Sequence, residues 1–87
     1  MNNVVWKYPI NIDGLTELTL PGGAQVLTVN LQNEKPFLWA MVDPDKHLTT
    51  RRFRLVATGE PFEAGNSLYV GTLFVEGGRF VFHLFEV

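Results

Sequence analysis

The sequence contains no cysteine, which excludes a disulfide framework and any thiolate metal site. Its two histidines lack the spacing of neighbouring ligands that a zinc site requires. Ser67 is the only serine, and no candidate base lies near it in the sequence. There is also no P-loop and no dinucleotide-binding fingerprint. We therefore predict that the protein is not an enzyme and has no catalytic residues, no metal site and no cofactor.

Long apolar runs are missing as well. The longest extend over only a few residues, whereas a helix that spans a bilayer needs about 20. The N-terminal residues show no basic region followed by an apolar stretch, so we expect no signal peptide. Together with the lack of cysteine, these features lead us to expect a soluble, cytoplasmic protein with no membrane partner.

Short runs of β-strand character dominate the chain, and turn residues separate them about every 8–12 residues. In Val26–Gln32, for example, Leu27, Val29 and Leu31 are expected to face one way. A polar loop is expected to run from Pro44 through Thr50. Strands are predicted over Val4–Ile10, Leu15–Leu20, Val26–Gln32, Phe37–Asp43, Arg52–Thr58, Leu68–Val75 and Arg79–Glu86. This pattern predicts a single all-β domain over residues 1–87, a small antiparallel sandwich or open barrel of about seven strands with no significant helix.

Positive charge is concentrated in one short segment. Four of the seven basic residues, Lys46, Arg51, Arg52 and Arg54, lie between positions 46 and 54 without an intervening acid. The rest of the chain has three basic residues against all nine acids, and the overall net charge is −2. A cationic segment on an acidic body can hold a small anion such as a phosphate. The acidic balance argues against binding to duplex nucleic acid.

This cationic segment is the first candidate ligand-binding site. On one face of a strand, Arg52 and Arg54 would lie roughly 6.5–7 Å apart, and each guanidinium could grip a phosphate. Lys46 and His47 precede them and could close over the ligand, while Arg51 should face the opposite way. The alternative is a solvated sheet face on which Arg52 and Arg54 pair with acids of a neighbouring strand.

Trp39, Gln32 and Asn33 form the second candidate site. An indole beside an amide-rich turn can stack a nucleobase and read its edge. The alternative is that Trp39 belongs to the core of a central strand. We expect His83 to be a partly buried ring that donates to a backbone carbonyl, rather than a catalytic base.

Several short motifs together resemble a family of small, uncharacterised, β-rich phage and prophage proteins. They are Trp6-Lys7-Tyr8-Pro9, Leu20-Pro21-x-Gly23-Ala24, Gln32-Asn33, Leu38-Trp39-Ala40-x-Val42-Asp43-Pro44, Thr58-Gly59 and Phe82-His83-x-Phe85-Glu86. The resemblance extends over most of the chain. It implies a phage-encoded accessory protein that acts in the cytoplasm of the infected bacterium. Small β-rich phage proteins include oligomers that trap cyclic-nucleotide immune signals, and this role extends to the chain by analogy.

We therefore expect a non-enzymatic homo-oligomer that binds and sequesters a small phosphorylated, nucleotide-like ligand. The alternative is a protein–protein interaction or virion-accessory module without a small-molecule ligand. In that case the apolar faces would bind the partner, and the arginines would only steer the encounter.

Overall fold

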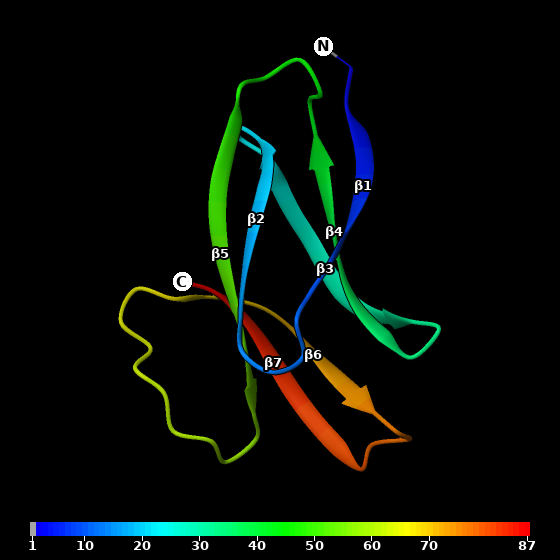
Figure 1. Cartoon of the computed structure of the whole chain (residues 1–87), viewed down its shortest axis with the longest axis vertical. Coiled ribbons are helices and arrows are strands. Elements are labelled where there is room, and N and C mark those ends of the chain that lie inside the picture. The colour runs from blue at the N-terminus through cyan, green and yellow to red at the C-terminus, as the bar shows by residue number, and fades with distance from the viewer. Residues whose placement is uncertain (1) are drawn as a thin grey trace.

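The structure is a computed structural model that describes residues 2–87 as seven β-strands with no helix (Figure 1). All strand pairings are antiparallel, which confirms the predicted fold class. Residues 2–87 accordingly provide no helix long and apolar enough to cross a membrane. The strands are β1 (Val4–Pro9), β2 (Leu15–Pro21), β3 (Gln25–Gln32), β4 (Lys35–Val42), β5 (Leu48–Ala57), β6 (Leu68–Val75) and β7 (Phe80–Glu86).

The strands form two sheets. One sheet has three strands in the order β1-β4-β3, and the other has four in the order β2-β5-β7-β6. The ten-residue β5 is the longest strand; its first part pairs with β2 and its last part with β7. Figure 1 shows β5 running along the long axis of the molecule. The edge position of β1 agrees with Pro9 near its end, because proline cannot donate to a ladder.

The core lies between the inward faces of the two sheets. In β4, Leu38, Ala40 and Val42 are buried, while the residues between them are only half-buried. Phe53 of β5 and Leu84 of β7 are fully buried in the same cluster. Removal of this apolar surface from water stabilises the fold. β4 is the central strand of its sheet.

The two sheets approach most closely at β3 and β6. A Cβ atom added to Gly71 of β6 would lie 2.9 Å from Cγ1 of Val29 in β3. No side chain other than hydrogen fits this gap without a shift of the backbone or of Val29. Gly71 therefore permits the close approach that joins the sheets along one side.

Two tight hairpin turns connect strands that are neighbours in the sequence. Asn33 and Glu34 connect β3 to β4 with φ angles of 51° and 63°, as in a type I′ turn. Glu76 begins the turn between β6 and β7 with a φ of 53°, and two glycines with positive φ follow it. Both turns bring a glutamate to the same end of the molecule.

The register of β3 differs from the prediction. A β-bulge between Val26 and Thr28 makes Leu27 the extra residue. Val26 therefore packs against the core, whereas Leu27 is 44% exposed instead of sharing a face with Val29. The expected alternation was wrong at this point because a bulge reverses the facing of the residues on one side of it.

The start of β5 was also predicted too late. The strand begins at Leu48, inside the segment expected to be a loop through Thr50. Leu48 pairs with Pro21 and Thr49 with Leu20, so backbone pairing with β2 extends the strand through polar residues. Tertiary pairing outweighs the local sequence preference here.

Candidate functional site

Arg51 of the cationic segment is neutralised within the chain. Its Nε and Nη2 atoms donate to the two carboxylate oxygens of Glu86, each at 2.7 Å, and Nη1 donates to the carbonyl of Ala24 at 2.5 Å. The hydrogen bond to Glu86 raises the pKa of Arg51 and outweighs the lowering effect of desolvation. All three hydrogen-bonding nitrogens have partners in the fold, so Arg51 has little capacity left for a ligand.

Arg52 and Arg54 lie on the opposite face, as the strand alternation predicted. Arg52 donates to the carboxylate of Glu17, its cross-strand neighbour in β2, at 2.9 Å. Both side chains remain more than half exposed. Arg54 lies opposite Leu15 and has no ion pair among residues 2–87. The alternative interpretation, a solvated sheet face on which the arginines pair with acids of a neighbouring strand, therefore applies to Arg52 but not to Arg54.

Lys46 and His47 lie in the turn before β5. The amide of Lys46 donates to the carbonyl of Asp43 at 3.1 Å, and the carbonyl of His47 accepts from the amide of Gly22 at 2.7 Å. None of the hollows described below is lined by Lys46, His47, Arg52 or Arg54. These four side chains therefore lie on exposed surface rather than in a cavity for an anion, whereas Arg51 lines a hollow of about 460 Å³ together with its partner Glu86.

The second candidate site has a more suitable geometry. Trp39 and Phe37 lie half-buried on the outward face of the β1-β4-β3 sheet, with ring centroids 6.2 Å apart and planes tilted by 60°. Trp39 is therefore not a core residue. Lys7 of β1 is the cross-strand neighbour of Trp39, and its Nζ lies 4.6 Å from the centre of the Phe37 ring. The same Nζ donates to Oε1 of Gln32 at 2.6 Å.

A hollow of about 430 Å³ adjoins Trp39. Its lining includes Thr28, Asn30 and Gln32, which provide hydroxyl and amide groups along β3. We call this surface the Trp39 face and define it by Lys7, Thr28, Asn30, Gln32, Phe37 and Trp39. It brings together Trp39 and Gln32 of the predicted site. Asn33 lies in the adjacent turn and does not line the hollow.

Sequence reasoning missed several members of this face. Thr28 pairs with Trp39 and Asn30 with Phe37, in the register that continues without a break from the Asn33–Glu34 turn. The tight turn was a usable signal for Asn30, because the register of a hairpin follows from its turn. Lys7 could not be placed without knowing that β1 pairs with β4.

His83 forms an unexpected polar chain on the outward face of the other sheet. Its Nε2 lies 2.7 Å from Oγ1 of Thr58, and its Nδ1 lies 3.0 Å from Oγ1 of Thr72. The hydroxyl of Tyr69 extends the chain at 2.5 Å from Thr72. The expected backbone-carbonyl partner was wrong, because the hydroxyls of Thr58, which directly follows β5, and of Thr72 in β6 flank the ring. His83 does not line any of these hollows. We therefore assign its hydrogen bonds a structural role in joining β5, β7 and β6.

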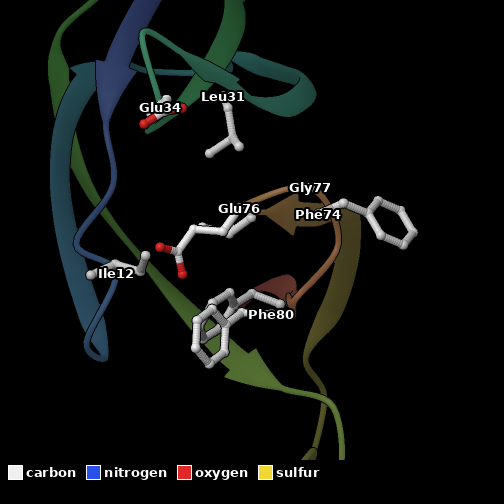
Figure 2. Close-up of a pocket in the computed structure, with 9 residues that line it drawn as sticks. Ile12, Leu31, Glu34, Phe74, Glu76, Gly77 and Phe80 are labelled. Atoms are coloured by element: carbon white, nitrogen blue, oxygen red, sulfur yellow. The ribbon is translucent and has the colours of Figure 1, made fainter.

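The largest of the described hollows lies at the end of the molecule where the two hairpins meet (Figure 2). We call it the hairpin pocket; it has a volume of about 590 Å³. Its apolar walls include Ile12, Leu31, Phe80 and Phe82, and two carboxylates, Glu34 and Glu76, belong to its lining. This pocket could not be predicted from the sequence, because its lining residues lie in or beside three separate connections of the chain.

Among residues 2–87 there is no group of three or more histidine, aspartate or glutamate side chains placed to hold a metal ion. No curated protein matches the chain, and no solved structure matches it. The model of one protein family, described as a domain of unknown function, DUF7352, matches residues 1–87. Because this match extends over the whole length, the chain belongs to the DUF7352 family.

Proposed function

We propose that this protein is a non-enzymatic binding protein and that its Trp39 face holds a small, phosphorylated, nucleotide-like ligand. The observation that carries the proposal is the half-buried indole of Trp39 beside a hollow lined by hydroxyl and amide groups. A nucleobase can stack on such a ring, and the polar groups of β3 can hydrogen-bond to its edge.

Lys7 supplies the positive charge that a phosphate requires. Its ammonium group is already positioned beside Phe37 and Gln32, so little conformational freedom remains to be lost on binding. In this proposal the phosphate lies at the β1 side of Trp39, near Lys7, and the base lies at the β3 side. The proposal thus moves the ligand from the cationic segment, where Arg51 and Arg52 are paired, to the other sheet.

Fluorescence titration tests the proposal directly. Trp6 and Trp39 are the only tryptophans, so a Trp6→Phe variant leaves Trp39 as the sole reporter. We expect saturable quenching by at least one member of a panel of AMP, ADP-ribose and cyclic dinucleotides. Loss of base stacking in Trp39→Leu should weaken binding about five- to a hundredfold. Calorimetry measures this change in affinity. Flat titrations across the panel would overturn the proposal.

Two charge variants locate the site. Lys7→Met should weaken binding of AMP but not of adenosine, because only AMP has a phosphate for the ammonium to meet. The double variant Arg52→Ala/Arg54→Ala should bind as the parent protein does. The opposite pattern, loss of binding in the arginine variant alone, would return the ligand to the cationic segment.

The narrower biological role is part of the same proposal. The resemblance to small phage proteins supports an accessory protein that sequesters a nucleotide-derived immune signal in the cytoplasm of an infected bacterium. Twelve large apolar side chains of the described residues are exposed, which supports a homo-oligomer. Mass spectrometry of small molecules released by heating the purified protein tests whether it sequesters a nucleotide-like compound. Light scattering tests whether it is a homo-oligomer. Release of no nucleotide-like compound from protein made in infected cells would count against sequestration.

A further inference from the structure

The hairpin pocket combines an apolar interior with an acidic opening. Phe82 packs against the core at its inner wall, and Phe80 and Leu31 complete the apolar lining. In Figure 2, the carboxylates of Glu34 and Glu76 lie on the side of the opening nearer Ile12. The pocket thus offers apolar contact and negative charge within one site.

Neither carboxylate is neutralised by the protein. The ion pairs among residues 2–87 are Arg51–Glu86 and Arg52–Glu17, so Glu34 and Glu76 have no basic partner within 4.0 Å. The basic residues nearest in sequence are Lys35, next to Glu34, and Arg79, three positions after Glu76, and neither forms an ion pair with these carboxylates. The guanidinium of Arg79 is directed to the ring of Phe80, with 5.4 Å between its Cζ atom and the ring centre. The pocket lining itself contains no lysine, arginine or histidine. A positive group on the ligand would therefore meet two uncompensated negative charges.

The surface around the opening is also apolar. Ile12, Phe74 and Phe80 are 45%, 64% and 45% exposed, and in Figure 2 the ring of Phe74 points away from the pocket. This rim extends the apolar surface beyond the volume that a small amine would fill. Exposed apolar side chains next to a pocket are typical of a surface that binds another protein.

From these features we propose that the hairpin pocket docks a segment of a partner protein that presents an apolar side chain next to an arginine or lysine. The apolar side chain enters between Leu31, Phe80 and Phe82. The basic side chain remains at the opening and pairs with Glu34 and Glu76. Leu31 lines both this pocket and the hollow beside Trp39, but the charged and polar groups of the two sites are different, so each proposal can fail without the other.

NMR titration of the ¹⁵N-labelled protein with three peptides tests the charge preference. The peptides are acetyl-Phe-Arg-Leu-amide, its citrulline analogue, which is uncharged and of the same shape, and its glutamate analogue. Because exposed ion pairs contribute little each, we expect the arginine peptide to bind about three- to tenfold more tightly than the citrulline peptide. The glutamate peptide should bind more weakly still, and the amides of residues 74–82 should shift.

The turn geometry offers variants that remove the charges without straining the backbone. Glycine at position 34 and asparagine at position 76 both adopt positive φ readily, so Glu34→Gly/Glu76→Asn should fold as the parent does. In this variant the preference for arginine over citrulline should disappear. The matched control, Asp45→Asn/Glu63→Gln, removes two negative charges outside the pocket lining and should keep the preference.

Three results would overturn the proposal. The first is the absence of any shift at residues 74–82 with millimolar arginine peptide. The second is equal binding of the arginine and citrulline peptides by the parent protein. The third is binding of 2-phenylethylamine as tight as that of the arginine peptide, because the pocket would then recognise a small organic cation and not a protein segment.

Discussion

Arg51 and Glu86 join β5 to the C-terminal end of β7 through two hydrogen bonds of 2.7 Å each. Their side chains are 25% and 22% exposed, so this pair is only partly screened by water. Arg52 and Glu17, the other ion pair among residues 2–87, are 62% and 55% exposed. Two adjacent arginines therefore lie in different dielectric surroundings, and the contribution of each pair to stability should differ.

The first prediction concerns this difference. Glu86→Gln should lower the free energy of unfolding by about 1–2 kcal/mol, because a charge-assisted, bidentate contact is lost and Arg51 is left partly buried. Glu17→Gln should lower it by at most about 1 kcal/mol, as is usual for exposed pairs. Urea unfolding measures both losses. The dependence of the free energy of unfolding on urea concentration, the m value, should stay unchanged. Equal losses of stability in the two variants would contradict the prediction that the Arg51–Glu86 pair contributes more than the Arg52–Glu17 pair.

The second prediction concerns the contact between the sheets. Gly71→Ala should destabilise the protein by about 1–3 kcal/mol, because the new methyl group would overlap Cγ1 of Val29. Val29→Ala removes that atom, so the double variant should lose less stability than the sum of the two single variants. Thermal unfolding of the four proteins gives the coupling. Additive losses would show that the strands do not approach as closely as described.

The third prediction concerns Tyr8, whose hydroxyl oxygen is buried without a hydrogen-bond partner among the described residues. Tyr8→Phe should therefore leave stability at pH 7 unchanged or raise it by up to about 1 kcal/mol. Burial also raises the pKa of Tyr8 above its ordinary value of 10.0. The unfolded chain then ionises first, so the parent protein should lose stability as the pH rises above 10.

Chemical unfolding of the parent and Tyr8→Phe proteins at a series of pH values separates this contribution from the other alkaline titrations. The stability difference should shift in favour of Tyr8→Phe above pH 10, because only the parent has a phenol at position 8. A difference that is constant with pH, or a clear loss of stability in the variant at pH 7, would show that the hydroxyl has a partner.

The fourth prediction concerns the turn between β3 and β4. Glu34 has a φ of 63° at the second position, where type I′ turns favour glycine. Glu34→Gly should raise the free energy of unfolding by about 0.5–1 kcal/mol. Asn33→Ala should lower it by a similar amount, because alanine tolerates positive φ less well than asparagine does. Guanidinium chloride unfolding measures both changes, and the same sign for the two would contradict the turn type.

Much of the fold could be predicted because the sequence determines it locally. The alternation of Leu18 and Leu20 with polar residues in β2, and the glycines at positions 77 and 78, act within a few residues. The bulge at Leu27 could not be predicted in this way, since it depends on which residue of β4 lies opposite. The early start of β5 likewise depends on pairing with β2.

The candidate sites were harder to predict than the strands. Trp39 and Gln32 were identified, because the hairpin that joins them is local. Lys7 was missed because strand order, which brings β1 beside β4, is not encoded in the strand pattern. The clustering of arginines suggested an anion site, but Glu17 and Glu86, both 35 residues away in sequence, take up two of their charges. Long-range pairs of this kind decide whether a charge run is available to a ligand.

The close contact at Gly71 and Val29 has a consequence for how the protein opens locally. The sheets are joined along β3 and β6, whereas on the opposite side every residue of β1 except Tyr8 is exposed. Backbone amides of β1 should therefore exchange their hydrogens with solvent first, through openings that leave the rest of the fold intact. Amides in the middle of β4 and β5 should exchange only when the whole chain unfolds.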